Sequence, residues 1–353
     1  MGLPGVWRYG LPYHRRVRAM ERLEWLYAIG EGPGANRIGY SAEEDAAHEL
    51  ARMWMVEAGL EVEVDEAGNL FGHANVSETG TRRVWTGSHL DTVPEGGKFD
   101  GALGVVAAIE AVERVGRGSV VVFRDEERGC AGSRARVTSG ELPGAFLELH
   151  IEQGPRLADA GAPLGIVTGI AGVMRGSIVV AGREGHAGTT PMGVRDDALV
   201  KAAREILRIE ETARTIEDAV ATVGQVEVEP GAVNVIPAGV TLSVDARAPD
   251  VERCDRLLAA IGFEPTYRVD PSEMAPELRD VLRAELEGRG LPVVELTSGA
   301  GHDAGVLATA GVPSAMLFVR SLNGGISHSP DELSSEEDVE LAVDVLAAAL
   351  ARL

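Results

Sequence analysis

The sequence has little lysine, little cysteine and no long apolar run. Lys98 and Lys201 are the only lysines, and the formal net charge of −22 would repel nucleic acid and anionic membranes. Cys130 and Cys254 lie far apart and match no metal-binding or redox spacing, so we expect two reduced thiols. No apolar run approaches the ~20 residues of a membrane-spanning helix, and residues 1–13 contain no signal-peptide core. We therefore expect a cytoplasmic protein without nucleic-acid or membrane partners.

The pattern of expected elements changes along the chain. The 353 residues, 45% of them apolar, suffice for one or two domains with full-sized cores. In the first part, continuous apolar runs such as 119–123 are typical of central strands covered on both faces. From 165 to 265 the expected order is strand, helix, two strands, helix, strand, which is ferredoxin-like. An α/β protein with a second α/β module is therefore predicted.

Three strands expected in the first part run directly into histidine or acidic side chains. They are the strands at 84–86, 119–123 and 145–149, which lead to His89, to Glu126 with Glu127, and to His150. Asp100 closes the glycine-rich loop that follows His89. Ligands gather at the carboxyl ends of strands in open α/β sheets, and imidazole with carboxylate suits a divalent metal such as zinc. One such motif alone would more simply be a surface loop, but three together favour a metal site.

The segments that carry these residues resemble a known family. They read GSHLDTV…GGKFDGALGV, DEE and ELHIEQGP, and they resemble the dinuclear zinc amidohydrolases of the hydantoinase/carbamoylase family, which belongs to a superfamily with aminoacylases and zinc carboxypeptidases. The resemblance runs from about residue 37 to 330. It implies a three-layer αβα metallopeptidase-like catalytic domain, residues 1–164 and 266–353. Residues 165–265 would form an inserted ferredoxin-like lid and dimerisation domain.

The resemblance also implies a metal centre. One divalent ion would be held by His89 and His150, a second by Glu127 and His328, and Asp100 would bridge the two. Zinc is expected, with manganese as the alternative, because sets of histidine and carboxylate accept both.

Further roles follow from the same resemblance. Asp91 would accept the free ring N–H of His89 and fix its tautomer. Glu126 would be the general base, taking a proton from metal-activated water and passing it to the leaving nitrogen. His186 would stabilise the developing oxyanion. The resemblance favours the site of the neighbouring subunit in a homodimer over the site of its own subunit, which stays the alternative.

Residues on the substrate side lie in three other segments. Asn234 and Arg247 would together hold a substrate carboxylate, because an arginine fork can bond both oxygens. Alternation along 240–247 places Arg247 on the polar face of its strand, which without the resemblance would be an ordinary solvated face. Gln153, Gly299 and His302 would also face the substrate. The activity implied is hydrolysis of a linear C–N amide or ureido bond in an N-carbamoyl-L-amino acid or an allantoate-like ureido acid.

The sequence departs from the family pattern at two places. Arg128 follows the acidic run where glycine is expected, and the segment between Glu127 and His150 is shorter than is usual in the family, which would open the site to a bulkier substrate. An aminoacylase or dipeptidase of the same superfamily would share the metal centre, but HIEQGP argues against it. A catalytically inactive metal-binding regulatory protein would more readily lack Glu126.

Overall fold

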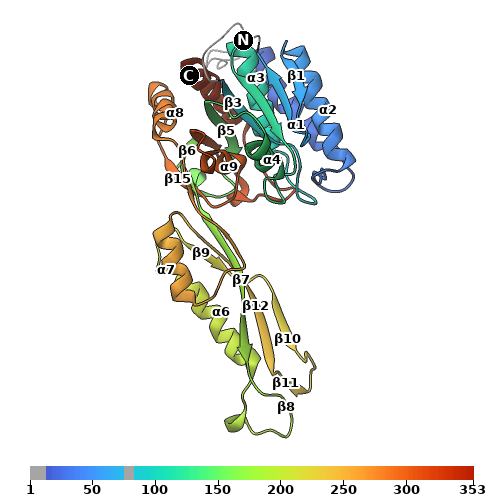
Figure 1. Ribbon diagram of the computed structural model, residues 1–353, viewed down its shortest axis with the longest axis vertical. Helices are drawn as coiled ribbons and strands as arrows, with labels where there is room; N and C mark the ends of the chain where they lie inside the picture. The colour runs from blue at the N-terminus through green and yellow to red at the C-terminus, as the bar shows by residue number, and fades with distance from the viewer. Residues whose placement is uncertain (1–12, 75–82) are drawn as a thin grey trace, which may run out of the picture. The chain divides into compact units, whose positions relative to one another are not determined.

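The chain divides into two compact units in the computed structural model, which describes residues 13–74 and 83–353 (Figure 1). The first unit holds the residues up to Thr168, with Glu273–Leu296 and Gly301–Leu353. The second unit, which we call the insert, holds Gly169–Ser272 and Thr297–Ala300. Its limits differ by a few residues from the predicted 165–265, because one strand runs across the boundary and a short later segment packs with the insert. No helix of the described residues is both long and apolar enough to cross a membrane.

The first unit is built on a mixed nine-stranded sheet. Its strands are β1 (Glu61–Val64), β2 (Leu70–His73), β3 (Val84–His89), β4 (Ser119–Phe123), β5 (Ala145–Ile151), β6 (Leu164–Ile170), β14 (Ser272–Glu273), β15 (Glu295–Ser298) and β16 (Ser314–Val319). The order is β1-β2-β4-β3-β5-β16-β6-β14, with β15 paired to β6. The four strands β4, β3, β5 and β16 are mutually parallel, so their carboxyl ends lie along one edge. His89 and His150 are thereby brought to the same edge of the sheet.

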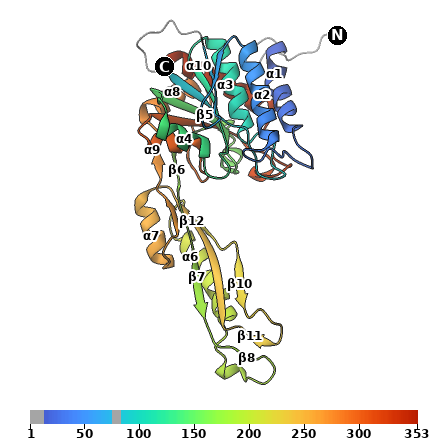
Figure 2. The ribbon, with the colours of Figure 1, turned by 45° about the vertical axis from the view of Figure 1, so that its right-hand side comes forward.

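Helices cover both faces of this sheet. They are α1 (Tyr13–Tyr27), α2 (Ala42–Glu57), α3 (Ala102–Val115), α4 (Ala131–Ser139), α5 (Arg156–Asp159), α8 (Pro276–Gly288), α9 (Asp303–Thr309) and α10 (Glu336–Arg352), with the 3₁₀ turn η2 (Asn323–Gly325). The step from β3 to β4 and the step from β4 to β5 run in opposite directions across the sheet. Right-handed crossovers therefore place α3 and α4 on opposite faces. Helices α1 and α2 lie beside α3 in both views (Figures 1 and 2), and all three contribute to the main apolar core.

Burial explains why the central strands could be predicted. Every residue of β4 and of β5 is buried, as a continuous apolar run requires when helices cover both faces. Helix α2 begins after Ser41, whose hydroxyl accepts the backbone N–H of Glu44 at 3.2 Å as an N-cap.

The insert has a separate antiparallel sheet. Its elements are β7 (Gly172–Ala181), β8 (Gly185–His186), η1 (Met192–Val194), α6 (Ala198–Arg214), β9 (Val220–Thr222), β10 (Val226–Glu229), β11 (Val235–Ile236), β12 (Gly239–Ala248), α7 (Val251–Ile261) and β13 (Tyr267–Val269). The order is β10-β12-β7-β13, β9 pairs with β12, and β8 with β11 forms a small separate ladder. With β9 and β10 taken as one interrupted strand, this is the ferredoxin-like order. The predicted fold class, a layered α/β domain with an inserted ferredoxin-like domain, is confirmed.

Candidate metal centre

Two buried histidines present the same ring nitrogen to one carboxylate. The Nδ1 atom of His89 lies 3.1 Å from the carbonyl oxygen of Asp91, and that of His150 lies 3.0 Å from the carbonyl oxygen of Ile151. A ring nitrogen that faces a carbonyl oxygen carries the hydrogen, so in the neutral imidazole each Nε2 keeps its lone pair. Both Nε2 atoms point at Asp100 Oδ1, at 3.5 Å and 3.3 Å. The two rings are thus oriented as metal ligands would be.

Asp100 belongs to two groups of potential ligands. The ligand atoms of His89, Asp100 and His150 lie within 4.8 Å of one another, and so do those of Asp100, Glu127 and His328. The Nε2 atom of His328 is 3.4 Å from Asp100 Oδ2 and 3.4 Å from Glu127 Oε2. One oxygen of Asp100 therefore faces the first group and the other oxygen faces the second. A carboxylate between two metal ions has this arrangement.

The crowding of acidic groups in the site favours bound cations. Burial and nearby acidic groups, including Asp303 and Glu127, raise the pKa of Glu126 well above its ordinary value. Burial and then Asp100 raise the pKa of Glu127. Burial alone would lower the pKa of His89, but the surrounding carboxylates raise it well above its usual range. Carboxylates crowded in this way repel one another unless cations lie among them. The imidazole and carboxylate donors are those that zinc and manganese accept.

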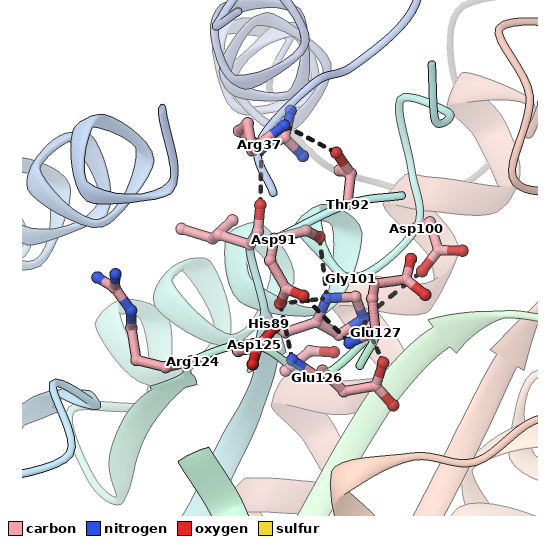
Figure 3. Close-up of polar contacts among 12 residues, drawn as sticks. Arg37, His89, Asp91, Thr92, Asp100, Gly101, Arg124, Asp125, Glu126 and Glu127 are labelled. Carbon is pink, nitrogen blue, oxygen red and sulfur yellow. Dashed lines mark hydrogen bonds and ion pairs between the residues drawn. The ribbon is translucent and has the colours of Figure 1, made fainter. Parts of the chain in front are cut away.

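Asp91 links three residues of the site. Its Oδ1 accepts the backbone N–H of Glu126 at 3.0 Å, and its Oδ2 accepts the backbone N–H of Glu127 at 3.1 Å (Figure 3). Oδ1 also lies 3.3 Å from Nδ1 of His89. The Asp91 side chain is fully buried, so these contacts have no competition from water. One carboxylate therefore orients a predicted ligand ring and fixes the backbone of both glutamates.

Arg37 stabilises the loop that carries Asp91, a role that sequence reasoning missed. Its Nε donates to the carbonyl oxygen of Leu90 at 2.7 Å, and its backbone N–H donates to the Thr92 hydroxyl at 2.9 Å (Figure 3). Burial lowers the pKa of Arg37 to about 10, which leaves the guanidinium charged at neutral pH. Arginine in a polar segment is usually exposed, and its sequence gives no sign that this one is completely buried.

Glu126 lies beside the two groups rather than within them. Its Oε2 is 3.8 Å from Nε2 of His89, and its Oε1 accepts a hydrogen bond from the Cys130 thiol at 3.5 Å. Glu127, the next residue, points its carboxylate at His328. Neighbouring glutamates thus face different partners, as different roles for the two would require.

Two of the residues predicted to face substrate lie among the metal-centre residues. Gln153 donates through Nε2 to Asp100 Oδ2 at 2.6 Å and to the Ser327 hydroxyl at 3.2 Å. The ring of His302 packs edge-on against His150, with ring centroids 4.6 Å apart. Burial lowers the pKa of His302 well below its ordinary value, so this ring is neutral.

His186 and Asn234 are neighbours in the insert. The carbonyl oxygen of Asn234 accepts the backbone N–H of Ala187 at 3.0 Å. The His186 ring is exposed, and its Nδ1 accepts the backbone N–H groups of Gly188 at 3.0 Å and Thr189 at 3.2 Å. Two donors at Nδ1 leave the ring hydrogen on Nε2 in neutral imidazole. The exposed edge of this ring is therefore a hydrogen-bond donor.

Arg247 lies at the other end of β12. Its Nε and NH2 contact the two oxygens of Asp245 at 2.8 Å and 3.2 Å, and its NH1 donates to the carbonyl oxygen of Gly299 at 2.7 Å. The eight residue steps from Gly239 to Arg247 span roughly 25 Å of strand, and β8 and β11 lie beyond Gly239 (Figure 1). The structure therefore brings Arg247 and Gly299 together, but within one insert it does not bring Arg247 and Asn234 together.

Known proteins resemble the chain over most of its length. A model of the peptidase family M20/M25/M40 matches residues 85–352. The N-carbamoyl-L-amino acid amidohydrolase of Geobacillus stearothermophilus is 38% identical over 93% of this chain and 96% of its own. The allantoate amidohydrolase of Escherichia coli (strain K12) is 32% identical over 96% of this chain and 98% of its own. A crystal structure of a hydantoinase/carbamoylase family amidase from Burkholderia ambifaria has a TM-score of 0.85 at 28% identity, covering 96% of both chains.

These likenesses agree with the residues gathered at the sheet edge. Fold and sequence define a hydrolase of the M20 class with donors suited to metal ions. Within that class the chain belongs to the hydantoinase/carbamoylase family of amidohydrolases, as the sequence motifs predicted. The alignment with the Geobacillus relative spans 395 positions, more than the 353 residues of this chain. The relative therefore has internal residues that this chain lacks.

Proposed function

We propose that the protein hydrolyses the linear C–N bond of an N-carbamoyl-L-amino acid or of a related, allantoate-like ureido acid. The observation that supports this most directly is Asp100, whose two oxygens face two separate groups of ligand atoms with Glu126 beside them. The relatives named as amidohydrolases of such substrates cover nearly the whole chain. Where the substrate carries a carbamoyl group, the products are the amino acid, ammonia and carbon dioxide.

The residues at the sheet edge have separate roles in the proposed reaction. Two divalent ions, zinc or manganese, would polarise the substrate carbonyl and lower the pKa of a water molecule; their ligands are His89, His150, Glu127, His328 and Asp100. The Glu126 carboxylate takes a proton from the attacking water and delivers it to the leaving nitrogen as the C–N bond breaks. The carboxylate of Asp91 keeps the hydrogen of His89 on Nδ1, so that Nε2 stays a ligand.

The substrate carboxylate is assigned to Arg247 with the neighbouring Gly299. The Nε–NH2 edge of Arg247 is engaged by Asp245, so the substrate would use the remaining hydrogens of NH1 and NH2. His186 donates from Nε2 to the developing oxyanion, with Asn234 beside it. Because roughly 25 Å of strand separates this pair from Arg247, one insert cannot supply both to one small substrate. We assign His186 and Asn234 to the site of a second copy in a homodimer.

A comparison of two adjacent glutamates tests the proposal. Protein purified without chelator should contain two equivalents of metal, lose activity with EDTA and regain it with zinc or manganese. Glu126→Gln should retain both ions and lose roughly 10²–10⁴-fold in kcat, because only proton transfer is removed. Glu127→Gln is the matched control and should also lose an ion. Near-normal turnover by Glu126→Gln would disprove its role as base.

A substrate panel distinguishes this activity from its relatives. Wild-type protein loaded with metal is assayed against N-carbamoyl-L-amino acids, allantoate, N-acyl amino acids and dipeptides. The proposal requires a preference for the ureido acids. A preference for N-acyl amino acids or dipeptides would instead indicate an aminoacylase or a dipeptidase. Metal binding without turnover on the panel would indicate a regulatory metal-binding protein.

A further inference from the structure

A buried glutamate outside the two ligand groups contacts both of the loops that carry Asp100 and His328. Oε1 of Glu332 accepts the backbone N–H of Phe99 at 2.7 Å and that of Asp100 at 3.0 Å. Its Oε2 accepts the hydroxyl of Ser327, the residue before His328, at 2.9 Å. The Glu332 side chain is only 5% exposed, so water does not compete for these bonds.

The loops that Glu332 joins have little other regular support. His89 and His150 belong to central strands, and the sheet fixes their positions. Asp100 and His328 instead lie in loops, and His328 has a φ of 55°, which is uncommon for a residue with a side chain. Their separation therefore depends on contacts between the loops. Glu332 supplies such contacts from one carboxylate.

The chain is shaped to admit this carboxylate. A Cβ atom at Gly97 would lie 2.2 Å from the carboxyl carbon of Glu332, so any side chain at position 97 would displace it. The Ser327 hydroxyl, bonded to Glu332, is also 3.2 Å from Asp100 Oδ2. The network thus reaches the oxygen of Asp100 that faces His328.

We propose that Glu332 is a positioning residue that sets the distance between Asp100 and His328 and thereby determines how tightly the second ion is held. This inference rests on the proposed two-ion site. It assigns Glu332 no contact with ion or substrate. It predicts an effect on the ion shared by Asp100, Glu127 and His328, while the ion held with His89 and His150 stays bound.

Three substitutions at this position separate geometry from charge. Glutamine can keep the two backbone N–H bonds through its oxygen, and its NH2 can donate to the Ser327 hydroxyl, so Glu332→Gln should preserve the geometry. Aspartate keeps the charge but is one methylene shorter, so Glu332→Asp cannot reach both loops. Alanine removes every contact. Glu285→Ala is the control, because it removes another buried glutamate, whose carboxylate pairs with Arg352 at 2.6 Å.

The readout is zinc binding to metal-free full-length protein, measured by calorimetry and by competition with a chromophoric chelator. Wild type should bind two ions. Glu332→Ala and Glu332→Asp should keep the first and bind the second about 10–100-fold more weakly, the range found for residues that orient metal ligands. Glu332→Gln and Glu285→Ala should bind both ions with affinities within about threefold of wild type, which is a smaller change than the loss of about 10-fold or more expected for the other two variants.

Each other outcome is informative. Unchanged affinity for the second ion in Glu332→Asp would overturn the inference, even if Glu332→Ala fails to fold. Equal losses in Glu332→Gln and Glu332→Asp would also overturn it, because the geometry that glutamine preserves would then not be sufficient to hold the second ion. If wild type itself binds fewer than two ions, the proposed two-ion function fails first.

Discussion

Replacement of Asp91 by asparagine should weaken the metal centre without emptying the space that the side chain fills. The carboxylate serves three N–H groups, those of the Glu126 backbone, the Glu127 backbone and the His89 ring. Asparagine is almost the same size but has one acceptor oxygen and one NH2 group. Whichever way the amide turns, at least one of the three donors then faces another donor in a fully buried position.

The contacts set the size of the effect. A hydrogen bond to a charged acceptor contributes ~1.5–3 kcal/mol, and a buried donor left without a partner costs about 1–3 kcal/mol. Asp91→Asn should therefore lower the free energy of unfolding by about 2–3 kcal/mol, with one such bond lost. An amide oxygen in the place of Oδ2 keeps only the N–H of Glu127, so the N–H of Glu126 and the ring of His89 both lose their side-chain acceptor. We then expect zinc affinity and kcat/KM to fall about 10–100-fold.

Three measurements check this expectation. Zinc affinity is measured against a chromophoric chelator, kcat/KM on the preferred ureido acid, and unfolding in urea on the metal-free protein. Asp125→Asn is the matched control, because Asp125 is also buried but directs its carboxylate at Arg128, 2.6 Å away. Affinity and kcat/KM in Asp91→Asn equal to those of Asp125→Asn would refute the assigned role of Asp91.

Three further predictions concern other parts of the chain. Arg247→Ala should raise KM strongly for ureido acids and much less for their neutral amides; an equal rise for both would remove Arg247 from carboxylate binding. Mixed dimers of inactive Glu126→Gln and His186→Ala subunits should recover partial activity, and no recovery in demonstrated heterodimers would place His186 elsewhere. Burial lowers the pKa of His48 from 6.5 to about 3, so the unfolded chain gains a proton on acidification while the folded form stays neutral. Metal-free wild type should therefore lose about 2 kcal/mol more unfolding free energy between pH 7 and pH 5 than His48→Gln; equal losses would contradict the shift.

The sheet edge that carries the candidate metal ligands could be predicted because its signals are local. The strands that deliver His89 and His150 are short apolar runs, and a buried strand of this kind needs no distant residue to be recognised. Parallel pairing then brings their ends together. The ferredoxin-like order of the insert could also be predicted, because segments with the alternating pattern of strands and segments with the helical pattern follow one another there in sequence.

Contacts between distant segments could not be read in this way. Glu332 follows Asp331 in a polar segment that looks solvated, and nothing near it in sequence indicates that its partners are Phe99 and Asp100. Arg37 is buried by contacts with loops far along the chain. Alternation along β12 indicated which face carries Arg247, but not how far along the strand it lies from Asn234.

The ten-residue pairing of β7 with β12 limits how this family member can evolve. The register runs without interruption from Gly172 opposite Ala248 to Ala181 opposite Gly239. A residue inserted into one strand alone would leave a bulge, and one residue in each would turn the later side chains to the opposite face. Only paired insertions or deletions of two residues preserve the faces, and each changes the length by about 7 Å. The separation between the His186 end and the Arg247 end can therefore change only in large, coordinated steps. Single-residue insertions or deletions would not preserve both the pairing and the faces of the two strands.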